Sequence, residues 1–222
     1  MTTIGIIGSG QIGMTVARLA VRAGHRIVLS NSRGPETLAG AVAELGPKAT
    51  AATSADAATA GDIVVISVPV AAFGNLPTAV VHGKTVIDTC NYGPERDGPI
   101  AELDDGSVTS SALLQRHLPG AAVVKVFNNI FYKHLLALAR PTGANDRSVL
   151  PLAGDSDAAK LTVTGLLDSI GYDALDAGAL ADSWHQETGT PVWGTPYGPY
   201  SQEQGAPADA ETIRAALAAA TR

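Results

Sequence analysis

A glycine-rich hexapeptide near the N-terminus has the residue types and spacing of a phosphate-binding loop. It matches the pattern G-x-G-x-x-G, and its residues are Gly8, Ser9, Gly10, Gln11, Ile12 and Gly13. It follows an apolar run at residues 3–7 and opens a stretch of helical periodicity at 11–22. There the first glycine permits a tight turn, the second lets the backbone approach a pyrophosphate, and the third lets helix and strand pack closely. The hexapeptide is therefore predicted to bind a dinucleotide, with the amides of the helix N-terminus facing its negative charge.

The residues after the second apolar run indicate which dinucleotide is bound. A site for NAD usually places an acidic residue there to accept hydrogen bonds from the ribose 2′-OH. This chain has Asn31, Ser32 and Arg33 instead. Arg33 supplies positive charge and a planar group suited to a phosphate, and the other two supply neutral donors. The three residues favour NADP, and Glu36 is the one nearby residue that argues for NAD.

Three more candidates follow the fourth and fifth apolar runs. Val68 and Pro69 end the fourth run, and Asn91 comes after the fifth. Because ligands bind at the carboxyl edge of open parallel sheets, these residues are predicted to line the nicotinamide and its ribose. Asn91 is equally suited to a turn before Tyr92 and Gly93, and the sequence does not separate the two roles.

Candidates for a catalytic role lie near the end of the sixth apolar run. The weak candidates are Lys125 and Asn128, which flank that end, and His134, which lies on the helix expected to follow; Asn129 comes directly after Asn128. The asparagines suit either capping of that helix or orientation of a ligand carbonyl or amide, and both interpretations stay open. A structural role is the simpler explanation for His134. The histidines show no metal-ligand spacing, and no Ser-His-Asp arrangement stands out, so no metal is expected.

The segment 184–200 is rich in aromatic residues. It holds both tryptophans of the chain, Trp184 and Trp193, together with His185, Tyr197 and Tyr200. A solvent-exposed loop does not explain this composition. The segment predicts either a stacking wall over a flat redox ring or a dimer contact, with equal support for each.

Strands that alternate with helices must position these residues. Strand-like runs lie at 3–7, 26–30, 48–53, 63–68, 85–88 and 122–127, and helices are predicted at 11–22, 36–45 and 111–117, from Ser54, and after Asn129. This alternation is typical of a parallel sheet with crossover helices. The predicted fold class is α/β, a Rossmann doubly wound parallel sheet.

The alternation changes after residue 140. Strands at 149–153 and 172–175 and helices at 156–170 and 209–220 predict a small C-terminal α/β annex. We therefore expect an NADP-binding Rossmann domain at 1–140 and a small C-terminal domain at 141–222.

Composition argues against several classes of protein. The 222 residues carry a net charge of −6 without a basic run, so a nucleic-acid surface is not indicated. No segment approaches the roughly 18 to 20 apolar residues that span a bilayer, and the N-terminus lacks the features of a signal peptide. A cytoplasmic protein is expected. Cys90, the single cysteine, ends an apolar run and is predicted to be a buried structural thiol.

Several segments resemble the NADP oxidoreductases that depend on the deazaflavin coenzyme F420. They are I-G-I-I-G-S-G-Q-I-G at the start, N-S-R at 31–33, V-V-K-V-F-N-N-I at 123–130, A-G-D-S-D-A-A-K at 153–160 and D-A-G-A-L at 176–180. The N-terminal segments are also similar to pyrroline-carboxylate reductases and to the reductase domain of the STEAP metalloreductases. The last two segments are more specific, and together the five extend over most of the chain.

The resemblance implies direct hydride transfer between NADPH and a deazaflavin ring in a homodimer whose small C-terminal domain closes over the cleft. The contacts it implies are Ser9, Gln11 and Ile12 to the pyrophosphate, Ser32 and Arg33 to the 2′-phosphate, and Val68 and Pro69 to the nicotinamide. Because the cofactors carry this reaction, little acid-base chemistry is required of the protein. The chain departs from better-known members at 125–129 and at 184–200, both near the acceptor site.

Three functions follow from these observations. The leading one is hydride exchange between NADPH and a deazaflavin. The second is NADPH-dependent reduction of another small acceptor, such as a flavin, an imine or a quinone. The third is an NADP(H)-sensing module, which is disfavoured because the chain has neither a basic face nor spare length for an output domain.

Overall fold

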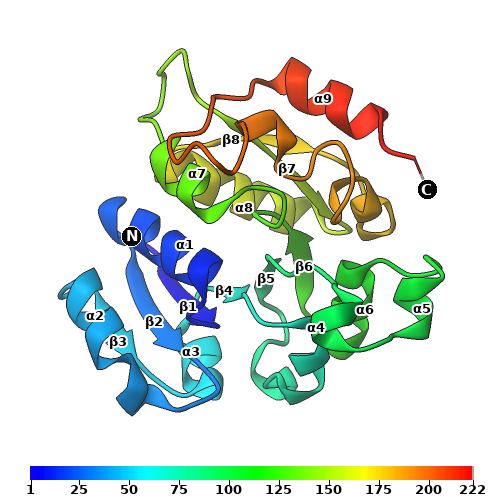
Figure 1. Ribbon diagram of the computed structural model, residues 1–222. Coiled ribbons are helices and arrows are strands. Elements are labelled where there is room, and N and C mark those ends of the chain that lie inside the picture. Colours follow the sequence, from blue (N-terminus) through cyan, green and yellow to red (C-terminus); the bar gives the residue numbers. More distant parts are fainter. Residues whose placement is uncertain (222) are drawn as a thin grey trace.

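The computed structural model describes residues 1–221, and its strands form an eight-stranded sheet in the order β3-β2-β1-β4-β5-β6-β7-β8 (Figure 1). The strands are β1 Thr3–Ile7, β2 Arg26–Ser30, β3 Ala49–Ala51, β4 Ile63–Ile66, β5 Thr85–Asp88, β6 Ala122–Lys125, β7 Val149–Gly154 and β8 Asp173–Asp176. Neighbouring strands are parallel except β6 and β7, which are antiparallel. The carboxyl ends of β1 to β6 therefore meet at one edge of the sheet.

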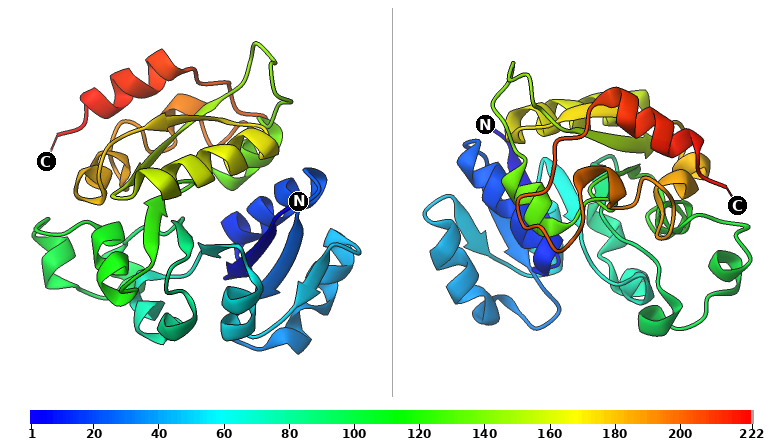
Figure 2. Two further views of the ribbon diagram at one scale, coloured as in Figure 1. Left: turned by 180° about the vertical axis from the view of Figure 1, so that it is seen from behind. Right: turned by 45° about the horizontal axis from the view of Figure 1, so that its top comes forward.

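Helices cover both faces of the sheet. The α-helices are α1 Gln11–Arg22, α2 Ala39–Leu45, α3 Ser54–Ala60, α4 Pro94–Asp97, α5 Ala101–Asp104, α6 Ser110–His117, α7 Tyr132–Ala137, α8 Asp157–Ile170 and α9 Ala210–Ala218. Short 3-10 helices are η1 Pro35–Leu38, η2 Val70–Asn75, η3 Thr78–Val80, η4 Leu180–Gln186 and η5 Thr195–Tyr197. Figure 2 shows α1 beside α7 and α8, where the N-terminal and C-terminal parts of the chain meet.

Alternation along β4 explains why two hydrophobic layers form. Ile63 and Val65 pack with α1, α2, α7 and α8 on one face, whereas Val64 and Ile66 pack with α3 and α6 on the other. A strand covered on both faces needs apolar residues at every position, which is what β4 has. The central strands are thereby fixed under helices, and only their ends are left to form a site.

Local signals set the helix ends. The side chains of Thr53, Thr109, Ser156 and Asp209 each accept a hydrogen bond from a backbone amide in the first turn of α3, α6, α8 and α9. Gly171 ends α8 in the left-handed conformation, at φ +107°. The start of α6 faces the C-terminal loop, which it contacts through hydrogen bonds to Leu180 and Glu187.

The predicted α/β fold class is confirmed, with three differences. The sheet is mixed, because β7 runs antiparallel to β6. The helix predicted at 36–45 begins as the 3-10 helix η1, and the unpredicted α4 and α5 precede α6. The division at residue 140 stays a prediction. In the described part of the chain, no helix has both the length and the apolar character needed to cross a bilayer.

Candidate nucleotide and acceptor site

The glycine loop joins β1 to α1 with almost no space for side chains at two of its positions. Gly8 has φ +113°, and a Cβ there would lie 2.0 Å from the carbonyl oxygen of Ser67. A Cβ on Gly13 would lie 2.1 Å from the carbonyl oxygen of Gly8. At Gly10 a Cβ would meet nothing within 4 Å. The loop is therefore tight where it packs on the protein and open at Gly10, where a pyrophosphate would approach.

The loop after β2 is held against the glycine loop by Asn31. Its Nδ2 donates to Thr37 Oγ1 at 2.9 Å and to Ser9 Oγ at 3.5 Å, and its Oδ1 accepts from the backbone amide of Arg33. The side chains of Ser32 and Arg33 are exposed beside this turn. Asn31 thus acts on the shape of the loop, and Arg33 and Ser32 remain available to a phosphate. The sequence analysis did not predict a role for Thr37, because its contact with Asn31 depends on how the loop folds.

Two cavities adjoin at the carboxyl edge of the sheet. The first, here called the strand-end cavity, is about 260 Å³, and its lining includes Val68, Pro69, Cys90 and Arg96. The second, called the aromatic cavity, is about 290 Å³, and its lining includes Asn128, Asn129, Phe131, Tyr132, Trp193 and Tyr200. Gln11, Ile12 and Asn91 line both. The predicted residues of the glycine loop, of β4 and of β5 are therefore brought together.

The aromatic segment contributes two of its rings to this site. Tyr200 lies edge-on to Phe131, with ring centroids 5.0 Å apart, and edge-on to Trp193, at 6.0 Å. Trp184 lies elsewhere: it stacks on His185 and lines a separate cavity with Glu187. The two tryptophans therefore differ in their surroundings: Trp193 lines the aromatic cavity and Trp184 does not, and the stacking-wall alternative stays a prediction. The dimer alternative stays a prediction.

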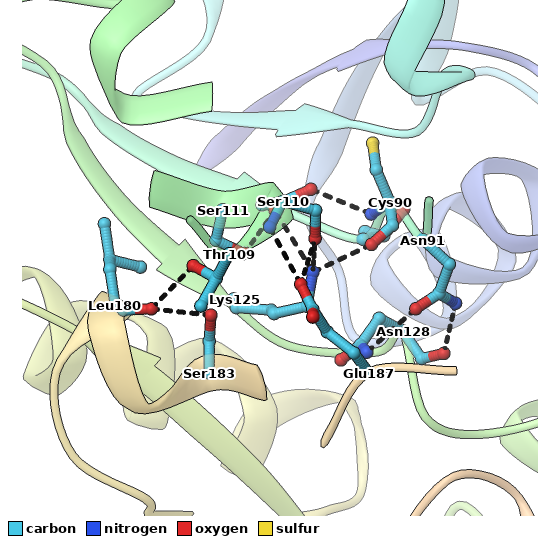
Figure 3. Close-up of polar contacts among 12 residues, drawn as sticks. Cys90, Asn91, Thr109, Ser110, Ser111, Lys125, Asn128, Leu180, Ser183 and Glu187 are labelled. Atoms are coloured by element: carbon cyan, nitrogen blue, oxygen red, sulfur yellow. Dashed lines mark hydrogen bonds and ion pairs between the residues drawn. The ribbon is translucent and has the colours of Figure 1, made fainter. Parts of the chain in front are cut away.

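Lys125 lies behind the cavities and does not line either of them. Its fully buried Nζ donates to the carbonyl oxygen of Cys90 at 2.8 Å and to Ser110 Oγ at 3.1 Å (Figure 3). The same Nζ pairs with Asp88 Oδ2 at 3.4 Å. Asp88 also accepts from Ser111 Oγ at 2.6 Å. A buried charge needs such partners. Lys125 consequently holds in place the residues that follow β5, which is a positioning role.

The C-terminal loop is tied to the same network from the other side. Glu187 Oε1 accepts from both the amide and the hydroxyl of Ser110, at 2.8 and 2.7 Å, as the sticks in Figure 3 show. Thr109 Oγ1 donates to the carbonyl oxygen of Leu180. These contacts attach η4 and the residues after it to the start of α6. Neither Asp88 nor Glu187 carries a local sequence signal that could have revealed its part.

The two asparagines after β6 do not cap α7, whose N-cap is Phe131 without a side-chain bond. Asn91 Nδ2 donates to the carbonyl oxygen of Asn128, and Asn128 Nδ2 donates back to Asn91 Oδ1. This reciprocal pair joins the ends of β5 and β6 between the two cavities. Asn91 therefore lines both cavities and is bonded to Asn128, and its contact with the nicotinamide stays a prediction.

His134 and Cys90 are both buried. Nε2 of His134 lies 2.6 Å from the carbonyl oxygen of Gln202, and the ring packs on Phe131 and Tyr200 without lining the aromatic cavity. Burial raises the pKa of the Cys90 thiol well above its ordinary value, which suits the predicted structural thiol. His134 supports the aromatic wall from behind.

Arg96 was missed by the sequence analysis. It lines the strand-end cavity, pairs with Asp97 at 2.7 Å and donates to the carbonyl oxygen of Asn91 at 2.5 Å. Burial alone would raise the pKa of Asp97, but Arg96 and the amides of Gly93 and Ala71 hold it below its ordinary value. Among the described residues that line the two cavities, Arg96 is the only cation.

Comparison with known proteins identifies the family. The model of the family "NADP oxidoreductase coenzyme F420-dependent" matches residues 3–92. A hypothetical protein of Sinorhizobium meliloti is 32% identical over 86% of this chain and 93% of its own, with a TM-score of 0.76. No curated protein matches at a significant level.

More distant structures share the fold. A candidate F420-dependent NADP-reductase of Arthrobacter sp. FB24 is 24% identical over 82% of this chain and 87% of its own, with a TM-score of 0.68. An imine reductase of Aspergillus terreus is 18% identical over 82% of this chain and 56% of its own, with a TM-score of 0.59. The chain belongs to the NADP oxidoreductase, coenzyme F420-dependent family, and by that membership it is an NADP-dependent oxidoreductase.

Proposed function

We propose that the chain transfers a hydride between NADPH and a deazaflavin of the coenzyme F420 type. One observation carries the proposal: the strand-end and aromatic cavities share Gln11, Ile12 and Asn91 as lining residues. Two ligands bound in adjoining cavities would have their rings next to each other, which is the arrangement that direct hydride transfer requires. The reduced nicotinamide supplies the hydride when bound.

The residues present fit NADP. Gly10 leaves the space beside the N-terminus of α1 open for a pyrophosphate. Ser32 and Arg33 are exposed next to the glycine loop, and no carboxylate occurs at 31–33 to repel a 2′-phosphate. Val68 and Pro69 line the strand-end cavity, on the side proposed for the nicotinamide.

The residues of the aromatic cavity fit a flat acceptor ring. Phe131, Trp193 and Tyr200 supply apolar walls against which such a ring can stack. Apolar walls also exclude water from the space between the two rings, which protects a hydride in transit. The chain's contribution is thus to bind, to orient and to exclude water.

A different acceptor is the second candidate. Among residues 1–221, the lining of the aromatic cavity includes no lysine, arginine or histidine, so nothing in that lining selects an acceptor with an anionic tail. This observation favours a small neutral acceptor, such as a flavin, an imine or a quinone. Among the described residues that line the two cavities, Arg96 is the one whose positive charge could bind an anionic tail, and it lines the strand-end cavity.

A panel of acceptors tests the proposal. Purified protein is given NADPH with oxidised coenzyme F420, FMN, riboflavin, a cyclic imine and a quinone in parallel, and absorbance follows each reaction. The proposal expects fast reduction of the deazaflavin and slow or no reduction of the others. Turnover of another acceptor with no deazaflavin reduction would replace it by the second candidate.

We also propose that the chain forms a homodimer, as the family resemblance implies. Light scattering after size-exclusion chromatography should then give twice the chain mass of 22.5 kDa. A single-chain mass at micromolar concentration would contradict this part of the proposal.

A further inference from the structure

Arg96, on the short helix α4, presents a positive charge to the strand-end cavity. Its Nη2 donates to the carbonyl oxygen of Asn91 at 2.5 Å and to Asp97 Oδ2 at 2.7 Å, and its Nε donates to Asp97 Oδ1 at 3.2 Å. The side chain lines the cavity and is 55% exposed, and its Nη1 has no hydrogen-bond partner among residues 1–221. The guanidinium is therefore held on one side and open to a ligand on the other.

The carboxylate that pairs with Arg96 lies behind it. The side chain of Asp97 is completely buried and lines neither cavity. It also accepts from the backbone amides of Gly93 at 3.0 Å and Ala71 at 3.5 Å. Because the interaction of two charges weakens with distance, a charge in the cavity is affected more by Arg96 than by Asp97. Asp97 thus cancels only part of the positive charge.

The rest of the lining adds no negative charge. Among the described residues that line the strand-end and aromatic cavities, none is an aspartate or a glutamate. Gln11 and Ile12, the first two residues of α1, line both cavities, and a helix N-terminus carries partial positive charge. The strand-end cavity therefore disfavours a ligand group that is positively charged.

The order of the strands relates Arg96 to the nicotinamide end of a bound cofactor. β1, β4 and β5 are neighbours in that order, and adjacent strands lie about 4.8 Å apart. A dinucleotide whose pyrophosphate meets the glycine loop after β1 would pass Val68 and Pro69, which follow β4, and extend toward Asn91 and Arg96, which follow β5. The nicotinamide ring would then share the cavity with the guanidinium.

We propose that Arg96 is a specificity-determining residue that makes the site bind NADPH more tightly than NADP⁺. The inference rests on the proposed function for the place of the nicotinamide ring. The two cofactor forms carry the same phosphates and differ in this ring, which is neutral in NADPH and positively charged in NADP⁺. A guanidinium in the same cavity repels only the oxidised ring. The site thereby favours the cofactor that brings the hydride and weakens its hold on the one that has lost it.

Cofactor affinities measured without an acceptor test this role. Calorimetry would give the Kd of NADPH and of NADP⁺ for the wild type and for Arg96→Met, which removes the charge and keeps an unbranched side chain. The preference for NADPH, expressed as the ratio of the two Kd values, should fall by about fivefold in Arg96→Met, since water and Asp97 weaken the repulsion. An apolar cavity also favours a neutral ring, so the change in the ratio is what measures Arg96. An unchanged ratio would overturn the inference.

Arg96→Lys and Arg33→Ala are the matched controls. Lysine keeps the positive charge without the two-point contact to Asp97, so Arg96→Lys should keep most of the wild-type ratio even if both affinities fall. Arg33→Ala removes a cation proposed to meet the 2′-phosphate, which both cofactor forms carry, so both affinities should fall together. A ratio that falls in either control as far as in Arg96→Met would contradict a charge effect of Arg96 on the ring.

Binding separates this inference from the proposed function, because the titrations contain no acceptor. If no deazaflavin is reduced but Arg96→Met lowers the preference for NADPH, the acceptor assignment fails and the role of Arg96 stands. If deazaflavin is reduced and the preference is the same in the wild type and in Arg96→Met, the reaction stands and the role of Arg96 fails.

Discussion

Asp88 on β5 and Lys125 on β6 are register partners in the sheet, and both side chains are completely buried. They are the ion pair from which the polar network of the site extends to Cys90, Ser110 and Ser111. Because the pair lies behind the two cavities, it acts on the position of the lining residues and makes no contact with the space that a ligand would fill.

Lys125→Met should destabilise the protein strongly. The substitution leaves Asp88 buried without its cation, and breaking a buried pair in this way costs about 3–5 kcal/mol. Urea unfolding would measure the loss. The control is Arg18→Met, because Arg18 and Glu44 form a partly exposed pair that contributes little. A Lys125→Met variant as stable as the control would show that the network does not support the fold.

Arg33→Ala should weaken the binding of NADPH far more than that of NADH. Only NADPH carries the 2′-phosphate that the guanidinium is proposed to meet, and losing such a charge-assisted contact should cost about ten- to a hundredfold in affinity. Equilibrium titration of both cofactors would give the ratio. Equal losses for the two cofactors would be inconsistent with the role given to Arg33.

Glu187→Ala should loosen the C-terminal loop without changing the binding of NADPH. The substitution removes both bonds to Ser110 and so frees the segment that carries Trp193 and Tyr200. The KM for the acceptor should rise severalfold, and limited proteolysis should cut more readily at 184–200. Glu187→Gln keeps one acceptor oxygen, so its KM for the acceptor and its susceptibility to proteolysis should stay close to those of the wild type. If both the KM and the proteolysis of Glu187→Ala are unchanged, Glu187 does not hold the C-terminal loop in place.

Cys90 should resist alkylation in the native protein. Burial raises the pKa of its thiol, so the reactive thiolate is scarce in the folded state even at pH 9. In the unfolded chain the thiol ionises from about pH 8.5, so the free energy of unfolding should fall as the pH rises above that value. Mass spectrometry after iodoacetamide treatment, with and without urea, would measure both states. Rapid labelling of the native protein would contradict the buried position.

Most of the fold was predictable because its signals are local. The apolar run of β1, the glycine loop, the periodicity of α1 and the run of β5 lie within short windows, and their bounds agree with the structure. The helix predicted at 36–45 is an exception. Pro35 begins a 3-10 helix, and the regular α-helix begins only at Ala39. The antiparallel placement of β7 depends on contacts across the sheet, which periodicity does not report.

The site was harder to predict because its key pairs depend on register and on distant segments. Nothing local indicates that Asp88 would lie opposite Lys125, since that follows from how two strands align. Glu187 meets Ser110 across 77 residues. Trp184 and Trp193 have similar surroundings in the sequence, yet only Trp193 lines the aromatic cavity. Residue types predicted the cofactor, whereas tertiary contacts decide which polar groups line the aromatic cavity.

Deuterium transfer is the most direct test of the central claim. NADPH labelled with deuterium at C4 on either face would be mixed with oxidised coenzyme F420 and the protein, and mass spectrometry would follow the label. We predict that one of the two labelled cofactors passes its deuterium to C5 of the deazaflavin, where a carbon-bound label is retained, with a primary isotope effect on the fast phase. Reduced deazaflavin without label, or no reduction of the deazaflavin at all, would contradict direct hydride transfer between the two rings.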